Sequence, residues 1–199
     1  MAPRTSYDKL IEIAAQQHGF VRTADAEDAG VKPVYLRKLA AAGRAKRLAQ
    51  GLYRVNVIPS TPLDEYREAV LRARGEGVVA GDAALALWEL ADVNPRTIDV
   101  VLPAGQQVRR KVPDRFRVRQ RRLAPADIDY VDGIPVMAAK VAIEEAIAGG
   151  LAGDIAAQAI ATARRRELIS QLTEARLLVK LADRNEAAHR APRVRRNLA

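Results

Sequence analysis

Apolar residues recur at helical spacing three times near the start of the chain, and glycines separate the three segments. A capping box opens the first predicted helix, and two shorter helices end at Gly30 and Gly43. Two extended segments follow, Arg44 to Leu48 and Leu52 to Val55, joined by a tight turn. Three helices followed by a hairpin predict a winged helix-turn-helix domain over residues 1–57.

The rest of the chain alternates between short extended segments and amphipathic helices. Ile58-Pro59-Ser60-Thr61-Pro62 is a stiff polar stretch and predicts a linker over residues 58–62. Beyond it, β-rich runs such as Thr97 to Leu102 lie between helices such as Ala139 to Ala148. Residues 63–185 are predicted to form a mixed α/β domain with a small sheet and several helices, and 186–199 a disordered basic tail. The predicted fold class of the whole chain is α+β.

Two apolar features of this second region bear on its core. Trp88 lies in a segment rich in Leu and Ala and is predicted to be a core residue. A longer apolar stripe follows the last helical segment and suits either the core or a partner helix. It consists of Leu168, Leu172, Ala175, Leu178, Val179 and Ala182.

The composition narrows the range of partners and compartments. The 199 residues carry a net charge of +9, which favours an anionic partner. Only 4% of them are aromatic, so binding of single strands by base stacking is not favoured. The lack of cysteine excludes disulfides and thiolate metal sites and fits a reducing compartment. Because no apolar run has membrane-spanning length and no secretory leader is recognised, we expect a cytoplasmic protein without a membrane partner.

The stretch from Val31 to Val57 holds seven basic residues and no acidic one. In its helix, Leu36 and Leu39 fall on one face, whereas two cations fall on the opposite face. Cations on the free face of such a helix suit the major groove of DNA, where they meet guanine O6 and N7. The cations of the hairpin are expected near phosphates. The predicted DNA-binding residues are Lys32, Tyr35, Arg37, Lys38, Arg44, Lys46, Arg47 and Arg54.

Several short motifs in this region occur in the order found in one family. They are His18-Gly19-Phe20-Val21-Arg22-Thr23-Ala24, Leu36-Arg37-Lys38-Leu39, Gly43-Arg44-Ala45-Lys46-Arg47-Leu48 and Gln50-Gly51-Leu52-Tyr53-Arg54-Val55. The chain resembles the AbiEi-type antitoxins of bacterial abortive-infection toxin–antitoxin operons, closely over residues 5–57 and more loosely over 60–183. Lys32 departs from the pattern, because Ser, Thr or Asn is the commoner helix cap. The resemblance implies an autorepressor of inverted promoter repeats in double-stranded DNA, whose C-terminal domain counters a nucleotidyltransferase-like toxin.

A second basic patch is predicted in the C-terminal region. Arg115 to Arg121 alternates strictly, so that period two puts four arginines on one face of a strand. With the preceding loop, the patch comprises Arg109, Arg110, Lys111, Arg115, Arg117, Arg119 and Arg121. It fits a solubilising edge strand as well as a further contact to DNA or to an acidic or RNA-bound partner.

Few residues are available for catalysis. One histidine closes a helix and the other lies in the tail, so no histidine-based metal site or triad is expected. A restriction-type nuclease needs an acid on one strand and an acid-x-Lys pair on the next; Asp99 supplies the first, but the strand at 115–121 holds no acid. We expect neither an enzyme nor a cofactor. The alternatives are a stand-alone regulator with a ligand-sensing C-terminal domain, the metal-dependent nuclease, and a winged helix that holds a protein partner.

Overall fold

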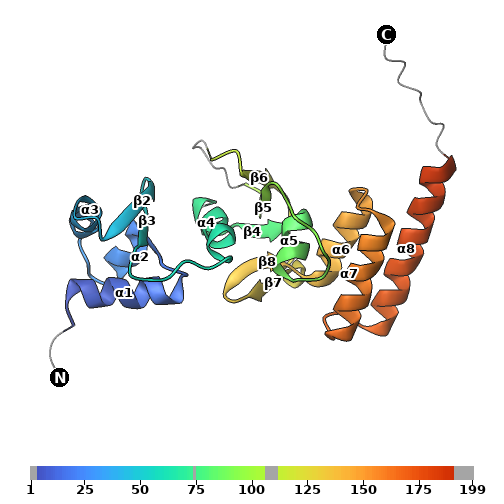
Figure 1. Ribbon diagram of the computed structural model, residues 1–199, viewed down its shortest axis with the longest axis horizontal. Coiled ribbons are helices and arrows are strands. Elements are labelled where there is room, and N and C mark those ends of the chain that lie inside the picture. The colour runs from blue at the N-terminus through green and yellow to red at the C-terminus, as the bar shows by residue number, and fades with distance from the viewer. Residues whose placement is uncertain (1–3, 74, 106–111, 191–199) are drawn as a thin grey trace, which may run out of the picture.

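The computed structural model describes residues 4–73, 75–105 and 112–190, and it is an α+β structure built around two sheets (Figure 1). The elements of the N-terminal part are α1 (Ser6–Gln16), β1 (Phe20–Arg22), α2 (Thr23–Asp28), α3 (Pro33–Ala41), β2 (Ala45–Ala49) and β3 (Leu52–Val55). Those of the C-terminal part are α4 (Asp64–Arg72), β4 (Val78–Ala80), α5 (Gly81–Leu87), β5 (Ile98–Leu102), β6 (Phe116–Gln120), η1 (Pro125–Asp127), β7 (Ile128–Val131), β8 (Ile134–Met137), α6 (Ala139–Ala148), α7 (Gly153–Arg165) and α8 (Gln171–Arg190).

The N-terminal domain is a winged helix with its own apolar core. Thr5 Oγ1 accepts a hydrogen bond from the backbone N–H of Asp8 at 3.2 Å, and this capping box starts α1. The strands form a three-stranded sheet of order β1-β3-β2, in which both outer strands run antiparallel to β3. Gly51 adopts a φ of +76° in the turn between the wing strands, a conformation that glycine adopts without strain. Leu10 and Leu36 are fully buried in the core beneath the helices.

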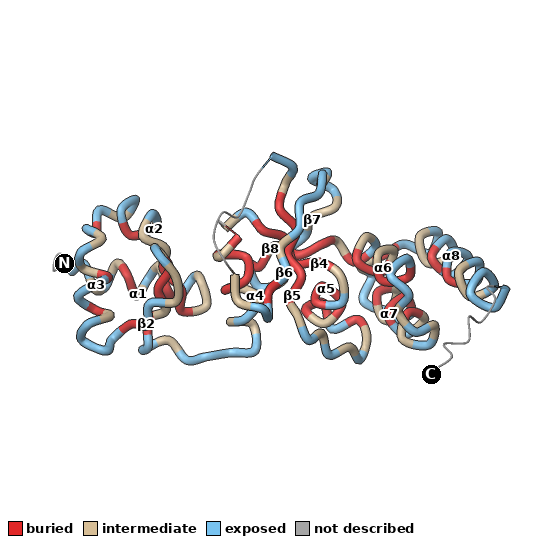
Figure 2. The backbone as a smooth tube through the Cα atoms, turned by 90° about the horizontal axis from the view of Figure 1, so that it is seen from above, coloured by how far each residue is buried: buried red, intermediate tan, exposed pale blue. Residues whose placement is uncertain are grey.

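The C-terminal domain contains a mixed five-stranded sheet of order β6-β5-β4-β8-β7. β5 runs parallel to β6 and antiparallel to β4, and β8 runs parallel to β4 and antiparallel to β7. Neighbouring residues of the inner strand β5 point to opposite faces of the sheet: α4 lies over Val100, and the start of α5 lies over Asp99. Figure 2 shows a continuous buried core running from this sheet into the bundle formed by α6, α7 and α8.

Most of the predicted elements of this domain are present. Trp88 is buried, and its Nε1–H donates to the carbonyl of Met137 at 2.8 Å, so the prediction of a core residue is confirmed. β7 was not predicted. The helix α8 continues to Arg190, so the prediction that a disordered tail begins at residue 186 is wrong for its first five residues. In the described part of the chain, no helix combines the length and apolarity needed to cross a membrane.

Helix α4 joins the two domains by packing against both. Leu71 contacts Phe20 and Leu52 on the outer face of the winged-helix sheet, opposite to the face that α1–α3 cover. Arg67 donates to Gln17 Oε1 at 2.9 Å and to the carbonyl of Gly133 at 3.2 Å. Burial lowers the pKa of Arg67 at this position.

Candidate nucleic-acid interface

Helix α3 presents its cations to solvent. Leu36 and Leu39 are buried beneath it, whereas Arg37 and Lys38 are exposed. The predicted facing of α3 is therefore confirmed. Val34, next to these cations, is one of the few large apolar side chains that are exposed.

The start of α3 differs from a usual helix N-terminus. Lys32 occupies the N-cap position and makes no side-chain capping hydrogen bond, and Pro33 follows it in the first turn. Proline is tolerated there because the first backbone N–H groups of a helix have no partner within it. The Lys32 side chain is exposed, and Tyr35 is half-buried against the N-terminal core. Lys32 thus adds a cation to the start of α3, while Tyr35 belongs mainly to the packing of the domain.

The wing places two cations beside α3, which packs against β2 (Figure 1). Lys46 pairs across the sheet with Arg54, and Arg47 pairs with Tyr53, so Lys46 and Arg47 lie on opposite faces of the edge strand β2. Both side chains are exposed. Arg47 shares the face of Tyr53, on which α3 packs, whereas Lys46 shares the face of Arg54 and is exposed at the edge of the sheet.

Arg44 is held by an aromatic ring that the sequence analysis did not identify. Its guanidinium carbon lies 3.9 Å from the centroid of the Tyr7 ring, which comes from α1. This cation–π contact fixes the plane of the guanidinium and leaves its N–H donors free at the edge. Tyr7 carried no signal in the sequence, because it precedes Arg44 by 37 residues and sits in an ordinary amphipathic helix.

Arg54 is not part of this surface, which corrects one sequence prediction. It lies on the central strand β3 and faces α4, where its Nη2 is 2.8 Å from Asp64 Oδ2. The Arg54 and Asp64 side chains are only 14% and 13% exposed. Because side chains alternate along a strand, Arg54 lies on the other face of the sheet from Tyr53 and Val55. The face that carries Arg54 is the one that the C-terminal domain covers.

A hydrogen-bonded group around Asp25 fixes the helix that precedes α3. The Asp25 carboxylate accepts from the backbone N–H of Arg22 at 3.0 Å, from its guanidinium at 2.6 Å, and from Gln17 Nε2 at 3.0 Å. Burial acts to raise the pKa of Asp25, but the hydrogen bonds from Arg22 and Gln17 outweigh it and leave the pKa lowered. The start of α2, and through it the path into α3, is therefore set by this carboxylate.

The described arginines of the second basic patch are all paired with acids. Arg115 contacts Glu68 at 2.7 Å, Arg117 and Arg119 contact Asp99 at 2.5 and 3.3 Å, and Arg121 pairs with Glu145. Hydrogen bonding to Asp99 raises the pKa of Arg117. Arg109, Arg110 and Lys111 lie outside the described residues. The described part of the patch, four of its seven residues, is therefore largely neutralised, in contrast to the surface of α3.

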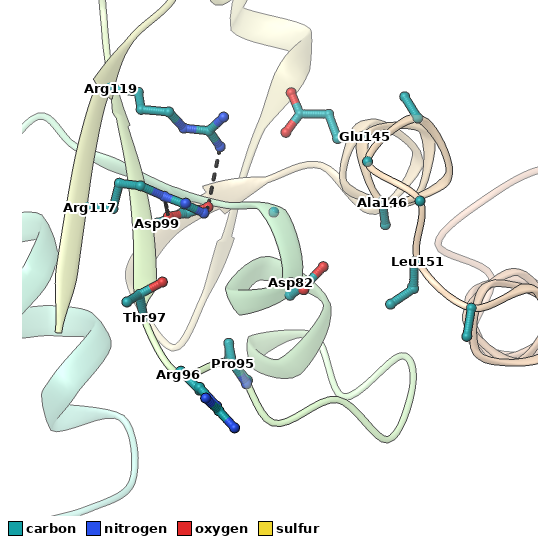
Figure 3. Close-up of a pocket in the computed structure, with 15 residues that line it drawn as sticks. Asp82, Pro95, Arg96, Thr97, Asp99, Arg117, Arg119, Glu145, Ala146 and Leu151 are labelled. Atoms are coloured by element: carbon teal, nitrogen blue, oxygen red, sulfur yellow. Dashed lines mark hydrogen bonds and ion pairs between the residues drawn. The ribbon is translucent and has the colours of Figure 1, made fainter. Parts of the chain in front are cut away.

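A cavity of about 760 Å³ lies between the sheet and the C-terminal end of α6 with the loop that follows it (Figure 3). Its charged lining residues are Asp82, Arg96, Asp99, Arg117, Arg119 and Glu145. Asp99, the candidate first acid of a nuclease, is buried and held by two guanidinium groups, so its carboxylate is not presented as an open metal ligand. Across the described ranges, no group of three or more His, Cys, Asp or Glu side chains is placed to hold a metal ion.

The N-terminal domain matches a known family model. Residues 8–56 match the family model described as transcriptional regulator, AbiEi antitoxin. The AbiEi match spans α1 through the wing and so contains every exposed cation described above for α3 and β2. The chain is also similar to a crystal structure of the RV2827C protein from Mycobacterium tuberculosis, with 18% identity, a TM-score of 0.48, and coverage of 97% of this chain and 84% of that one. A search of curated proteins gave no significant match.

Proposed function

We propose that this protein is the antitoxin of a bacterial toxin–antitoxin pair and represses its own promoter. Its AbiEi-type domain binds inverted repeats in operator DNA, and its C-terminal domain counteracts a nucleotidyltransferase-like toxin. One observation carries the DNA-binding half: α3 and β2 expose five cations within a stretch that has no acidic residue. They are Lys32, Arg37, Lys38, Lys46 and Arg47.

The proposed docking follows from the dimensions of α3 and the order of its exposed residues. An α-helix with its side chains is about 10–12 Å across, which suits a major groove about 12 Å wide. Arg37 and Lys38 project from the free face toward base edges, and Val34 supplies an apolar contact for a thymine methyl group. Arg44, stacked on Tyr7, joins the wing in contacting phosphates.

The proposal for the toxin rests on the family description and on the placement of the two domains. The AbiEi description names both a transcriptional regulator and an antitoxin. The bundle of α6, α7 and α8 lies at the end of the molecule opposite to α3 (Figure 1). A toxin bound at that end and a duplex bound at α3 would therefore not compete for one surface.

The two activities are separated by one variant and two assays. The double variant Arg37→Ala/Lys38→Ala is expected to lose repression of a reporter driven by the protein's own promoter, because it loses the base contacts. It should still restore growth to cells that express the cognate nucleotidyltransferase. Arg165→Ala, which changes an exposed arginine on α7, is the matched control for repression. Full repression by the double variant would refute the proposed role of α3, and failure of the wild type to restore growth would refute the role as an antitoxin.

The cavity beside Asp99 favours a second candidate, a stand-alone regulator whose C-terminal domain senses a small molecule. A space of about 760 Å³ is large enough for a metabolite, and its lining carries both signs of charge. This candidate predicts that a polar small molecule changes operator affinity and that Arg96→Ala, which alters the exposed rim of the cavity, abolishes the change. It also predicts that no neighbouring gene is toxic.

A further inference from the structure

The outer face of α8 is apolar and uncovered. Leu177 and Leu181 are buried on the inner face against the neighbouring helices, whereas Leu172, Leu178 and Val179 are 63%, 45% and 61% exposed. Over the described residues, half of the six exposed large apolar side chains therefore lie on this one helix. Such concentration on one element is typical of an interaction site.

The spacing of these residues suits a second helix. Leu172, Ala175, Val179 and Ala182 follow one another at intervals of three, four and three, the repeat of a coiled-coil seam. The two alanines are small and allow the axis of a second helix to approach closely. A groove of about 570 Å³ beside the seam, between α6 and α8, is lined by Ala175, Val179 and neighbouring residues. The predicted apolar stripe thus belongs to a surface along most of its length rather than to the core.

The charges beside the seam of one α8 are complementary to those beside the seam of a second α8 in antiparallel orientation. Arg176 and Asp183 flank it on one side, seven residues apart, and within the described part of the chain neither has an ion-pair partner. The midpoint between them falls next to Val179, in the middle of the seam. If two α8 helices cross antiparallel about a two-fold axis at that midpoint, each Arg176 lies beside the Asp183 of the other copy. Opposite charges in this arrangement fix both orientation and register.

We propose that the occupant of this face is a second copy of the chain, and that α8 forms an antiparallel, two-fold symmetric dimer. The interface is self-complementary in both its apolar seam and its flanking charges, as a two-fold contact requires. Because one helix crosses one copy of itself, the interface is small, and we expect association in roughly the micromolar range.

The dimer has a consequence for DNA that rests on the proposed function. Figures 1 and 2 both place α8 at the end of the molecule opposite to the winged helix. A dimer through α8 therefore holds its two α3 helices at its two far ends. Each repeat of an operator is then bound by one winged helix, and the dimer can join two separate duplexes or two distant operators on one duplex.

The dimer is tested by sedimentation velocity on the full chain without DNA over a concentration series. Val179→Asp is expected to raise the dissociation constant by roughly 100-fold or more, because it places two unpaired carboxylates in the seam. Val57→Asp, at an apolar side chain that is 59% exposed after the wing, is the matched control and should leave the constant unchanged. Arg176→Asp and Asp183→Arg should each weaken the dimer about tenfold, and combining them should restore it.

Three results would overturn the dimer. The wild type could remain monomeric up to about 100 µM, or Val57→Asp could raise the dissociation constant as much as Val179→Asp does. The charge-swapped double variant could also dimerise no more tightly than the single variants. If a chain ending at Arg190 dimerised where the full chain did not, the occupant would be the last nine residues instead. Bridging is measured separately, by capture of a labelled duplex on a bead-bound one. The arrangement is supported if Val179→Asp loses bridging but still binds a single duplex. If the wild type does not bind a single duplex, the proposed function is refuted, but the dimer is not.

Discussion

Arg47 and Arg54 both lie on the wing, but Arg47 is exposed whereas Arg54 is mostly buried, and they should therefore respond differently to removal. Arg47→Ala deletes an exposed cation on β2, whereas Arg54→Ala deletes the partner of Asp64 at the domain boundary. We expect the first variant to change the salt dependence of DNA binding without changing stability. We expect the second to change stability without changing the salt dependence.

The magnitude of the first effect follows from counterion release. If Lys32, Arg44, Lys46 and Arg47 contact phosphates, log K falls with log salt at a slope of about −3.6, since each contact contributes about −0.9. Arg47→Ala should reduce the slope to about −2.7. Between 50 and 200 mM salt, the wild type should therefore lose roughly 3.5-fold more affinity than this variant.

The magnitude of the second effect follows from burial. The Arg54 and Asp64 side chains are 14% and 13% exposed, between a surface pair and a fully buried one. Leaving Asp64 without its arginine should cost about 2 kcal/mol, which corresponds to a fall in Tm of about 4–8 °C. Thermal unfolding gives the stability, and fluorescence anisotropy of a labelled duplex over a salt series gives the slope. An Arg54→Ala variant whose slope fell by about 0.9 while its Tm held would refute the assignment of Arg54 to the domain boundary.

Three further predictions concern the same domain. Arg37→Ala should weaken operator binding by about 1–3 kcal/mol and random-sequence binding much less; equal losses in a competition assay would show that Arg37 does not contact bases. Tyr7→Ala should weaken binding by about 0.5–1 kcal/mol through the loss of the ring beneath Arg44, whereas Tyr7→Phe should bind like the wild type. Asp25→Asn should lower the free energy of unfolding at pH 7 by about 1–2 kcal/mol. Because folding lowers the pKa of Asp25, the wild type should lose this advantage as pH falls from the ordinary carboxyl pKa through the folded value, and parallel acid-unfolding curves for the two proteins would contradict that.

The features that the sequence predicted well are those that short-range periodicity encodes. Leu36 and Leu39 define the buried face of α3 within one helical turn, so Arg37 and Lys38 had to lie outside. The alternation in β6 likewise placed Phe116 inside and the arginines outside. Each of these inferences needs only the geometry of one element.

The features that were missed depend on what packs against an element. Which face of the wing α4 covers is a tertiary property, so the burial of Arg54 left no local signal. The acids that neutralise the second patch come from three other elements, α4, β5 and α6, and only the folded arrangement brings them beside β6. β7 carries exposed Asp129 and Tyr130 and lacks a clear apolar alternation. The end of α8 is held by Arg184, which donates to the carbonyl of Ile147 at 3.3 Å, so the helix persists where composition alone predicted a tail.

The position of α4 also limits how this protein can be cut or recombined. A fragment that stops at the linker would leave Phe20 and Leu52 without Leu71, and so would expose an apolar patch that favours aggregation. Extending the fragment through α4 does not solve the problem, because Ala69 and Val70 of that helix are buried in the core of the neighbouring sheet. Chimeras that exchange the winged helix among relatives should therefore carry matched residues on both sides of α4, and we expect the two halves to be inherited as one unit.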